Sequence, residues 1–229
     1  MYDWYGEQTA GFFGVHNALE PLHVQLNLLD NYINIVNGLL HPLSNITLIA
    51  TQYILSTEGK LSQPISVCNV QLNTVRESSV TTSPCKIHSD SYPISFVGLQ
   101  LLNGTQMLSD NFYWLSSVPE APDAYTRLNS LNPCVVDISV ISCEQSVIQI
   151  HIANQNSYED GTLAFFLRLQ VLNATEDRIL PVHYSDNYFS LLPQQSKIIS
   201  ISFQTSENWM IQLSGWNVQP LKLLSSACT

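Results

Sequence analysis

Apolar and polar residues alternate with a period of two through most of the chain, and this pattern constrains the fold more than any other. In the first half the alternating segments are VQLNLL (24–29), YINIVN (32–37) and NITLIATQYILS (45–56). In the second half they are residues 134–143, 146–155, 161–173, 178–185, 196–206 and 209–217. Because successive side chains of a strand point to opposite faces, this spacing predicts half-buried antiparallel strands. Helical character is confined to the residues before Leu22.

These strands group into two halves, each of about a hundred residues with turn residues at regular intervals, which is typical of an immunoglobulin-like sandwich. Residues 118–133 (VPEAPDAYTRLNSLNP) interrupt the alternation and contain prolines, which indicates a linker. The predicted fold is therefore all-β, with a first sandwich over 23–117 and a second sandwich over 134–229. A chain of 229 residues that is 45% hydrophobic can bury both cores.

Two short stretches give local predictions. In SKIISISF, the alternation places Ile199, Ile201 and Phe203 in the core and the intervening serines toward water. Burying each of these apolar side chains stabilises the fold by roughly 1.5–3 kcal/mol. Asn103-Gly104 lies between two apolar runs, and this dipeptide favours the positive φ angles of a type I′ hairpin turn.

Charge and hydropathy exclude two classes of partner. The net charge is −10, which would repel nucleic acid and an anionic membrane surface. No apolar run approaches the ~20 residues that span a bilayer. The N-terminal residues lack the basic region and apolar run of a signal peptide. We therefore expect neither a nucleic acid nor a membrane partner.

Cysteines and glycosylation sequons bear on the cellular compartment. The five cysteines, an odd number without any C-x-x-C pair, are Cys68, Cys85, Cys134, Cys143 and Cys228. We expect buried free thiols, with bridges between Cys68 and Cys85 or between Cys134 and Cys143 as the alternatives. Three sequons make Asn45, Asn103 and Asn173 candidate N-glycosylation sites, and their use would imply a secretory route.

The segment RILPVHYSDNYFSLLPQQSK (178–197) brings a histidine, a serine and an aspartate close together in sequence. A catalytic triad needs these side chains to converge, but on one strand His183 and Ser185 share a face about 7 Å apart while Asp186 points to the other face. No G-x-S-x-G elbow is present. We instead predict a strand that ends near Ser185 and a turn in which Asp186 and Asn187 cap local backbone groups.

Metal, cofactor and acid–base chemistry have no clear signature. The six histidines have no paired spacing, so no metal site is predicted. The glycines Gly11 and Gly14 match neither phosphate-loop fingerprint, and no cofactor is predicted. Glu7 and Glu20 are the acids in an aromatic-rich setting, yet a sandwich offers no deep cleft for a pair of catalytic carboxylates. Glu7 and Glu20 are therefore not predicted to be such a pair.

Three segments carry a family resemblance: YDWYGEQTAGFFGVHNALEPLHVQLN (2–27), NFYWLSS (111–117) and RILPVHYSDNYFSLLPQQS (178–196). They resemble the C-terminal part of glycoside hydrolase family 2 enzymes, and are most similar to plant-type mannosylglycoprotein endo-β-mannosidases and exo-β-glucosaminidases. The resemblance covers nearly the whole chain, with poor matches over 57–92 and 118–160.

The resemblance implies an architecture in which immunoglobulin-like domains follow a (β/α)₈ catalytic barrel. Residues 1–22 would then be the last barrel helix and its exit segment. The catalytic glutamates of the family would lie upstream of Met1, so this chain would be inactive alone. Its partners would be the N-terminal and catalytic domains, in cis or as companion polypeptides, and an oligosaccharide substrate bound by the parent enzyme.

The resemblance also suggests what the parent enzyme does. It implies hydrolysis of β-mannosidic linkages in N-glycan cores, in a secretory, vacuolar or lysosomal compartment. The tip of the 178–197 segment, with His183, Asp186 and Asn187, is a candidate cleft-lining loop. A truncated gene model and a processed C-terminal polypeptide both fit such a chain.

The N-terminal residues are crowded with large rings, namely Tyr2, Trp4, Tyr5, Phe12 and Phe13. So much apolar surface needs a packing partner, which we expect to be the barrel. The chain expressed alone should then be poorly soluble or self-associating. The alternative is a freestanding carbohydrate-binding or adhesion module, without hydrolase activity, in which Trp114, Trp209 and Trp216 form a sugar platform.

Overall fold

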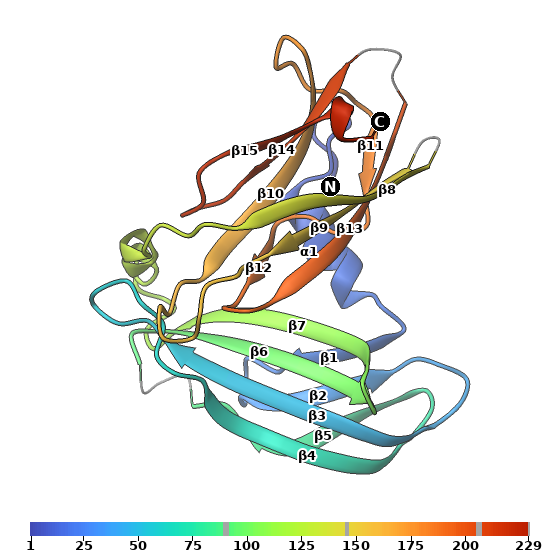
Figure 1. Cartoon of the computed structure of the whole chain (residues 1–229). Coiled ribbons are helices and arrows are strands. Elements are labelled where there is room, and N and C mark those ends of the chain that lie inside the picture. The colour runs from blue at the N-terminus through green and yellow to red at the C-terminus, as the bar shows by residue number, and fades with distance from the viewer. Residues whose placement is uncertain (89–91, 145–146, 205–207, 229) are drawn as a thin grey trace. The chain divides into compact units, whose positions relative to one another are not determined.

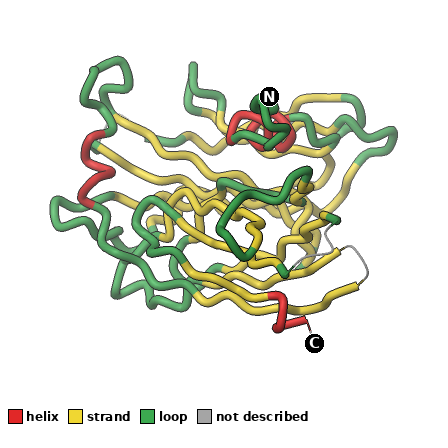
Figure 2. The backbone as a smooth tube through the Cα atoms, turned by 90° about the horizontal axis from the view of Figure 1, so that it is seen from above, coloured by secondary structure: helices red, strands yellow, loops and turns green. Residues whose placement is uncertain are grey.

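The computed structural model describes residues 1–88, 92–144, 147–204 and 208–228, and it confirms the all-β fold. Strands dominate the trace in Figures 1 and 2. The chain forms two compact units, one made of residues 17–130 and the other of residues 1–16 together with residues from 131 onward. The segment boundaries predicted at residues 22, 117 and 133 stay predictions. Among the described residues, no helix is long and apolar enough to cross a membrane.

The unit of residues 17–130 contains two antiparallel sheets. The three-stranded sheet has the order β1-β2-β5, and the four-stranded sheet has the order β4-β3-β6-β7. The elements are β1 (Leu22–Leu26), β2 (Tyr32–Asn37), β3 (Leu43–Ile54), β4 (Ile65–Val75), β5 (Ser79–Lys86), β6 (Ile94–Asn103), β7 (Gln106–Ser116) and the short 3-10 helix η2 (Thr126–Ser130). Alternate apolar residues such as Ile33, Ile35, Ile46 and Leu48 are fully buried between these strands.

The other unit also contains two antiparallel sheets, with the orders β12-β10-β14-β15 and β11-β13-β9-β8. Its strands are β8 (Asp137–Glu144), β9 (Val147–Ala153), β10 (Ala164–Asn173), β11 (Val182–Tyr184), β12 (Phe189–Leu191), β13 (Ser196–Phe203), β14 (Trp209–Ser214) and β15 (Leu221–Leu224). Helix α1 (Ala10–Ala18) precedes the first strand of the chain, and the 3-10 helix η3 (Ser225–Cys228) follows the last strand. The two four-stranded sheets enclose one apolar cluster.

The predicted inward residues of β13 are confirmed. Ile199 and Ile201 are fully buried and Phe203 is 9% exposed, all within the apolar cluster of this unit. The hairpin between β6 and β7 is also present, but its turn differs from the prediction. Asn103 pairs with Gln106, so the two central residues are Gly104 and Thr105.

The type I′ prediction at this hairpin is wrong by one residue. Gly104 has φ +60°, whereas Thr105 is not among the residues with positive φ. A single positive φ at a glycine in the first central position matches the type II′ pattern. Asn103 therefore ends the strand and does not enter the turn.

The expectation of free thiols is wrong for four of the five cysteines, whereas the alternative bridge between Cys68 and Cys85 is confirmed. Disulfides join Cys68 of β4 to Cys85 of β5, and Cys143 of β8 to Cys228 of η3, each with 5.7 Å between the Cα atoms. The alternative bridge between Cys134 and Cys143 does not form. Cys134 is a buried free thiol, and its burial raises the pKa to about 11. The partner of Cys143 follows the last strand, where strand alternation gives no information on position.

Candidate functional site

The first nine residues fold into a tight loop. The amide N–H of Asp3 donates to the carbonyl oxygen of Glu7 at 2.9 Å. In return, Oδ1 of Asp3 accepts hydrogen bonds from the amide N–H groups of Tyr5 and Glu7, both at 2.9 Å. Gly6 has φ +83°, a left-handed conformation that glycine adopts without steric penalty. A short acidic side chain and a glycine thus shape this loop.

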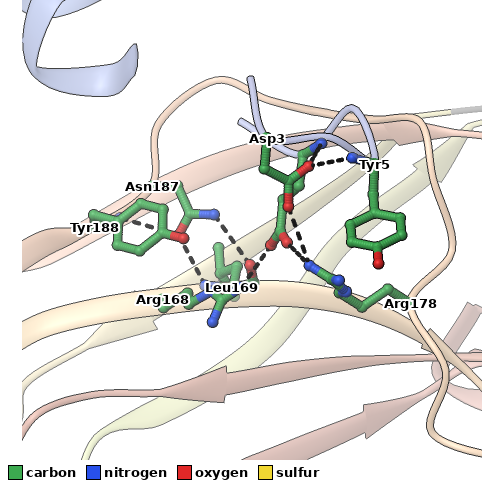
Figure 3. A network of polar contacts seen from close by, with 8 residues as sticks. Asp3, Tyr5, Arg168, Leu169, Arg178, Asn187 and Tyr188 are labelled. Atoms are coloured by element: carbon green, nitrogen blue, oxygen red, sulfur yellow. Dashed lines mark hydrogen bonds and ion pairs between the residues drawn. The ribbon is translucent and has the colours of Figure 1, made fainter. Parts of the chain in front are cut away.

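The loop places the Glu7 side chain between two arginines of the second sandwich. Figure 3 shows these arginines, Arg168 and Arg178, together with Asp3 of the loop. Glu7 Oε1 accepts a hydrogen bond from Nη2 of Arg168 at 2.6 Å, and Glu7 Oε2 pairs with Nη1 of Arg178. The Asp3 carboxylate lies 3.5 Å from the same Nη1 of Arg178. The Glu7 side chain is only 11% exposed. We call these four charged residues the N-terminal clamp; its two acids balance its two arginines.

The two arginines come from neighbouring segments of the chain. Arg168 lies within β10. After β10 ends, the chain turns back, and Arg178 forms an isolated antiparallel bridge with Leu172. The amide N–H of Ile179 then donates to the carbonyl oxygen of Val171 at 2.9 Å. This return brings Arg178 alongside the strand that carries Arg168.

The side chain of Asn187 bonds to the backbone of β10 next to Arg168, as the backbone of a neighbouring strand would. Its Oδ1 accepts a hydrogen bond from the amide N–H of Leu169 at 2.8 Å, and its Nδ2 donates to the carbonyl oxygen of Leu169 at 3.0 Å. Asn187 is 3% exposed. Two backbone groups next to Arg168 are thereby satisfied away from bulk water, which buried polar groups require.

Aromatic rings surround the clamp. The guanidinium carbon of Arg168 lies 5.7 Å from the centre of the Tyr188 ring, and that of Arg178 lies 5.3 Å from the centre of the Tyr5 ring. Such distances allow cation–π attraction. The Tyr188 ring also contacts Phe13 of α1, with 6.1 Å between ring centres. Phe13 is 2% exposed, so α1 has an apolar contact with the second sandwich in addition to the clamp.

The pKa values of three residues in and around the clamp are shifted by their surroundings. Hydrogen bonds from the Glu7 and Tyr5 amides, together with the Arg178 charge, lower the pKa of Asp3. The hydrogen bond with Glu7 raises the pKa of Arg178. Burial raises the pKa of Tyr188.

This arrangement favours anchoring over acid–base catalysis. Both carboxylate oxygens of Glu7 accept hydrogen bonds from guanidinium groups, which do not release protons in proteins. A general base needs a lone pair within reach of the substrate proton, but both carboxylate oxygens of Glu7 are hydrogen-bonded to arginines. Over the described part of the chain, no group of three or more His, Cys, Asp or Glu side chains could hold a metal ion.

Residues 111–218, which include both arginines and Asn187, match the family described as the exo-beta-D-glucosaminidase Ig-fold domain. These residues are therefore similar to that Ig-fold domain. The mannosylglycoprotein endo-beta-mannosidase of Lilium longiflorum is 32% identical to the chain, over 95% of this chain and 29% of the relative. The exo-beta-D-glucosaminidase of Streptomyces avermitilis is 24% identical, over 95% of this chain and 26% of the relative.

The fold comparison agrees with the sequence comparison. The crystal structure of the Amycolatopsis orientalis exo-chitosanase matches with a TM-score of 0.76 at 19% identity, and covers 98% of this chain and 29% of that chain. The resemblance to glycoside hydrolase family 2 enzymes is therefore confirmed. The chain spans less than a third of the length of these relatives.

Within the Ig-fold domain, HYSD does not form a triad. His183 is exposed on β11, opposite Ser202 of β13. Ser185 Oγ accepts a hydrogen bond from the amide N–H of Ser200 at 3.0 Å. Asp186 is 7% exposed, and its Oδ2 lies 2.5 Å from the ammonium nitrogen of Lys197. The serine, the aspartate and the histidine thus have separate surroundings.

Asp186 and Asn187 accept hydrogen bonds from local backbone groups, as predicted, and Asn187 also bonds to the distant residue Leu169. Asp186 Oδ1 accepts a hydrogen bond from the Asn187 amide, and Asn187 Oδ1 accepts one from the Tyr188 amide, at 2.8 and 3.0 Å. Sequence reasoning missed the longer-range bonds of Asn187 to Leu169. A cleft-lining role for His183, Asp186 and Asn187 stays a prediction.

The N-terminal rings have mixed environments. Phe13 is buried against the Ig-fold domain, so part of the apolar surface expected to need the barrel has a partner within this chain. Tyr2, Trp4 and Tyr5 remain 53%, 94% and 68% exposed. Trp209 contacts Phe203 edge-on at 5.5 Å between ring centres, while Trp114 and Trp216 are 39% and 58% exposed. The sugar-platform role of these tryptophans stays a prediction.

Sequence reasoning did not assign a role to Arg168 or Arg178. One signal was present: the chain has only eight lysines and arginines, and Arg168 interrupts the apolar run AFFLRLQVL. A charged residue at an inner position of such a run is rarely buried unless it has a partner. The partner, Glu7, is 161 residues away in sequence, which no local pattern reveals.

Proposed function

We propose that this chain is an accessory segment of a family 2 β-glycosidase, in which its sandwiches support the catalytic barrel. We further propose that the whole protein hydrolyses β-mannosidic linkages of N-glycan cores. The name of the Lilium longiflorum relative supports this substrate, and the 32% identity to it exceeds the 24% identity to the Streptomyces glucosaminidase.

The observation that carries the supporting role is the N-terminal clamp. Asp3 and Glu7 lie in the segment that the family resemblance makes the end of the barrel, while Arg168 and Arg178 belong to the Ig-fold domain. A segment held by two arginines and a buried phenylalanine has a fixed position on that domain. Such an anchor would restrict the motion of whatever is continuous with the segment.

In this proposal the chemistry occurs elsewhere in the whole protein. Retaining glycosidases use two carboxyl groups about 5–5.5 Å apart, one as nucleophile and one as acid/base. The contribution of this chain is positional, because small displacements of reacting groups cost rate. It holds the segment that leads into the catalytic domain.

The full-length protein tests both parts. It should release sugar from glycopeptides that carry the mannose-β-1,4-N-acetylglucosamine core and leave chitosan oligomers intact, while this chain alone should release nothing from either. The reverse preference would contradict the substrate assignment. It would leave the supporting role standing.

A Glu7→Gln variant of the full-length enzyme tests the supporting role. It should lose activity at a lower temperature than the native enzyme, with kcat and KM unchanged at low temperature. Lys222→Ala, which removes an exposed pair with Glu176, is the matched control and should behave as the native enzyme. Equal inactivation temperatures for all three proteins would contradict the supporting role.

One observation favours a second candidate, a binding module. Trp216 is 58% exposed, and indole rings can stack on sugars. In that case the chain alone would bind oligosaccharides in calorimetry, and Trp216→Ala would abolish the binding. Absence of binding by the native chain would remove this candidate.

A further inference from the structure

Two of the three sequon asparagines present unengaged side chains at the surface. Asn45 and Asn103 are both exposed. Over the described residues, neither carboxamide takes part in a side-chain hydrogen bond, whereas those of Asn187 and Asn154 do. The Nδ2 atoms of Asn45 and Asn103 are therefore free to be substituted without loss of an internal contact.

These two asparagines lie close together on neighbouring strands. Asn103, the last residue of β6, is paired with Ile46 of β3, and Asn45 directly precedes Ile46. With strands about 4.8 Å apart and a rise of about 3.4 Å per residue, the two Cα atoms lie about 6 Å apart. Both sequons thus belong to one end of one sheet.

Independent support comes from the two disulfides. Cys68–Cys85 and Cys143–Cys228 tie each compact unit internally. Structural disulfides form and persist in oxidising compartments such as the secretory pathway, and are rare in the cytosol. N-glycosylation of sequons takes place in the same pathway, so the disulfides and the exposed sequons indicate one cellular route.

We propose that Asn45 and Asn103 carry N-linked glycans, which cover this end of the sheet β4-β3-β6-β7. In the transfer step the carboxamide Nδ2 attacks the anomeric carbon of an oligosaccharide that is linked to a lipid diphosphate. The C–N bond forms, the C–O bond to the diphosphate breaks, and the amide gives up one proton. No electron transfer is involved, and the lipid diphosphate is the leaving group.

The third sequon has a different local structure. Asn173 is half-buried, and its Oδ1 accepts hydrogen bonds from the amides of Thr175 and Asp177 at 3.0 and 2.9 Å. The hydroxyl of Thr175, which belongs to the sequon, donates to the same Oδ1 at 2.8 Å. Asn173 stays a predicted acceptor, but the two-site proposal does not depend on it.

Peptide mapping of the protein purified from its natural source tests the proposal. Enzymatic removal of N-glycans converts each occupied asparagine to aspartate, which mass spectrometry detects in the peptides that contain Asn45 and Asn103. We expect both peptides to carry glycan before the treatment and aspartate after it. Unmodified asparagine at both positions in the untreated protein would overturn the proposal.

Variants at the sequon hydroxyl separate glycosylation from other effects. Thr105→Ala removes the Asn103 sequon without touching the asparagine, whereas Thr105→Ser keeps it; Thr105 is exposed in the turn, so both should fold. In a eukaryotic secretory host, Thr105→Ala should lose one glycan and gain electrophoretic mobility, and Thr105→Ser should match the native protein. Equal mobility of all three proteins would contradict occupancy of Asn103.

Discussion

Glu7 Oε1 and Arg168 Nη2 lie 2.6 Å apart although 161 residues separate them in sequence. This contact fixes Glu7 on strand β10, within the compact unit that residues 1–16 form together with residues from 131 onward. Because the Glu7 side chain is nearly buried, loss of either partner leaves a charge that is poorly solvated.

The Arg168–Glu7 pair should therefore contribute measurably to stability. Arg168→Lys keeps the charge but removes the planar donor group, and we expect it to lower the free energy of unfolding by about 1–3 kcal/mol, between the values for exposed and buried pairs. Chemical denaturation measures this change. Lys222→Ala is the control, and we expect a change within about 0.5 kcal/mol because the Lys222–Glu176 pair is exposed. Equal effects of the two variants would show that the clamp adds nothing.

The Asn187 carboxamide should matter at least as much. Asn187→Ala leaves the amide N–H and the carbonyl oxygen of Leu169 without their side-chain partners, and we expect a loss of about 2–4 kcal/mol in unfolding free energy. Asn103→Ala is the matched control, because Asn103 is exposed. Protein from a bacterial host excludes any effect of glycans. Amide hydrogen exchange at Leu169 should be faster in Asn187→Ala, and unchanged exchange would contradict the bonding scheme.

His23 should make the unit of residues 17–130 sensitive to acid. Burial lowers its pKa, although the nearby Glu20 and Asp110 act in the opposite direction. Its Nε2 lies 3.2 Å from Nδ2 of Asn111, which as an amide donor requires an unprotonated Nε2. The unfolded chain binds a proton at a higher pH than the folded chain. The contribution of His23 is therefore fully present above the unfolded pKa of about 6.5 and is lost as pH falls below it.

Thermal unfolding as a function of pH checks this expectation. His23→Gln should flatten the decline in Tm below pH 6.5, whereas His41→Gln, a change at an exposed histidine, should leave it as in the native protein. If Tm of His23→Gln falls below pH 6.5 as steeply as Tm of the native protein, groups other than His23 cause the acid sensitivity.

The cleft-lining hypothesis predicts a specific effect of His183. Its side chain is exposed, so in the full-length enzyme His183→Ala should raise KM and leave Tm unchanged if the loop touches the saccharide. Asp186→Ala is the contrast, because it removes the ion pair with Lys197 and should lower Tm. An unchanged KM in His183→Ala would assign this segment to structure alone.

The alternation of residues predicted the sandwiches because burial on one face is a local, periodic property. It placed Ile199 and Ile201 in the core correctly. It could not reveal β12, which has three residues and follows Tyr188, a residue with φ +59°. At such a position the backbone leaves the extended region, so no regular alternation leads into the strand.

The candidate site was less predictable for a different reason. Its contacts join Glu7 to Arg168 and Arg178, which are 161 and 171 residues away in sequence. No strand or helix periodicity relates positions so far apart. The same holds for Cys228, whose pairing with Cys143 spans 85 residues. Sequence could indicate that Arg168 needs a partner, but only the fold identifies which residue supplies it.

The edge of β10 is covered in stages by three kinds of neighbour. Strand β12 pairs with Ala164 and Leu167, the Asn187 side chain bonds to Leu169, and the returning chain bonds to Val171 and Leu172. Exposed strand edges invite pairing with other copies and lead to aggregation. A single asparagine side chain thus fills the interval that a short strand and a turn leave open, and its loss would be expected to give foreign strands access there.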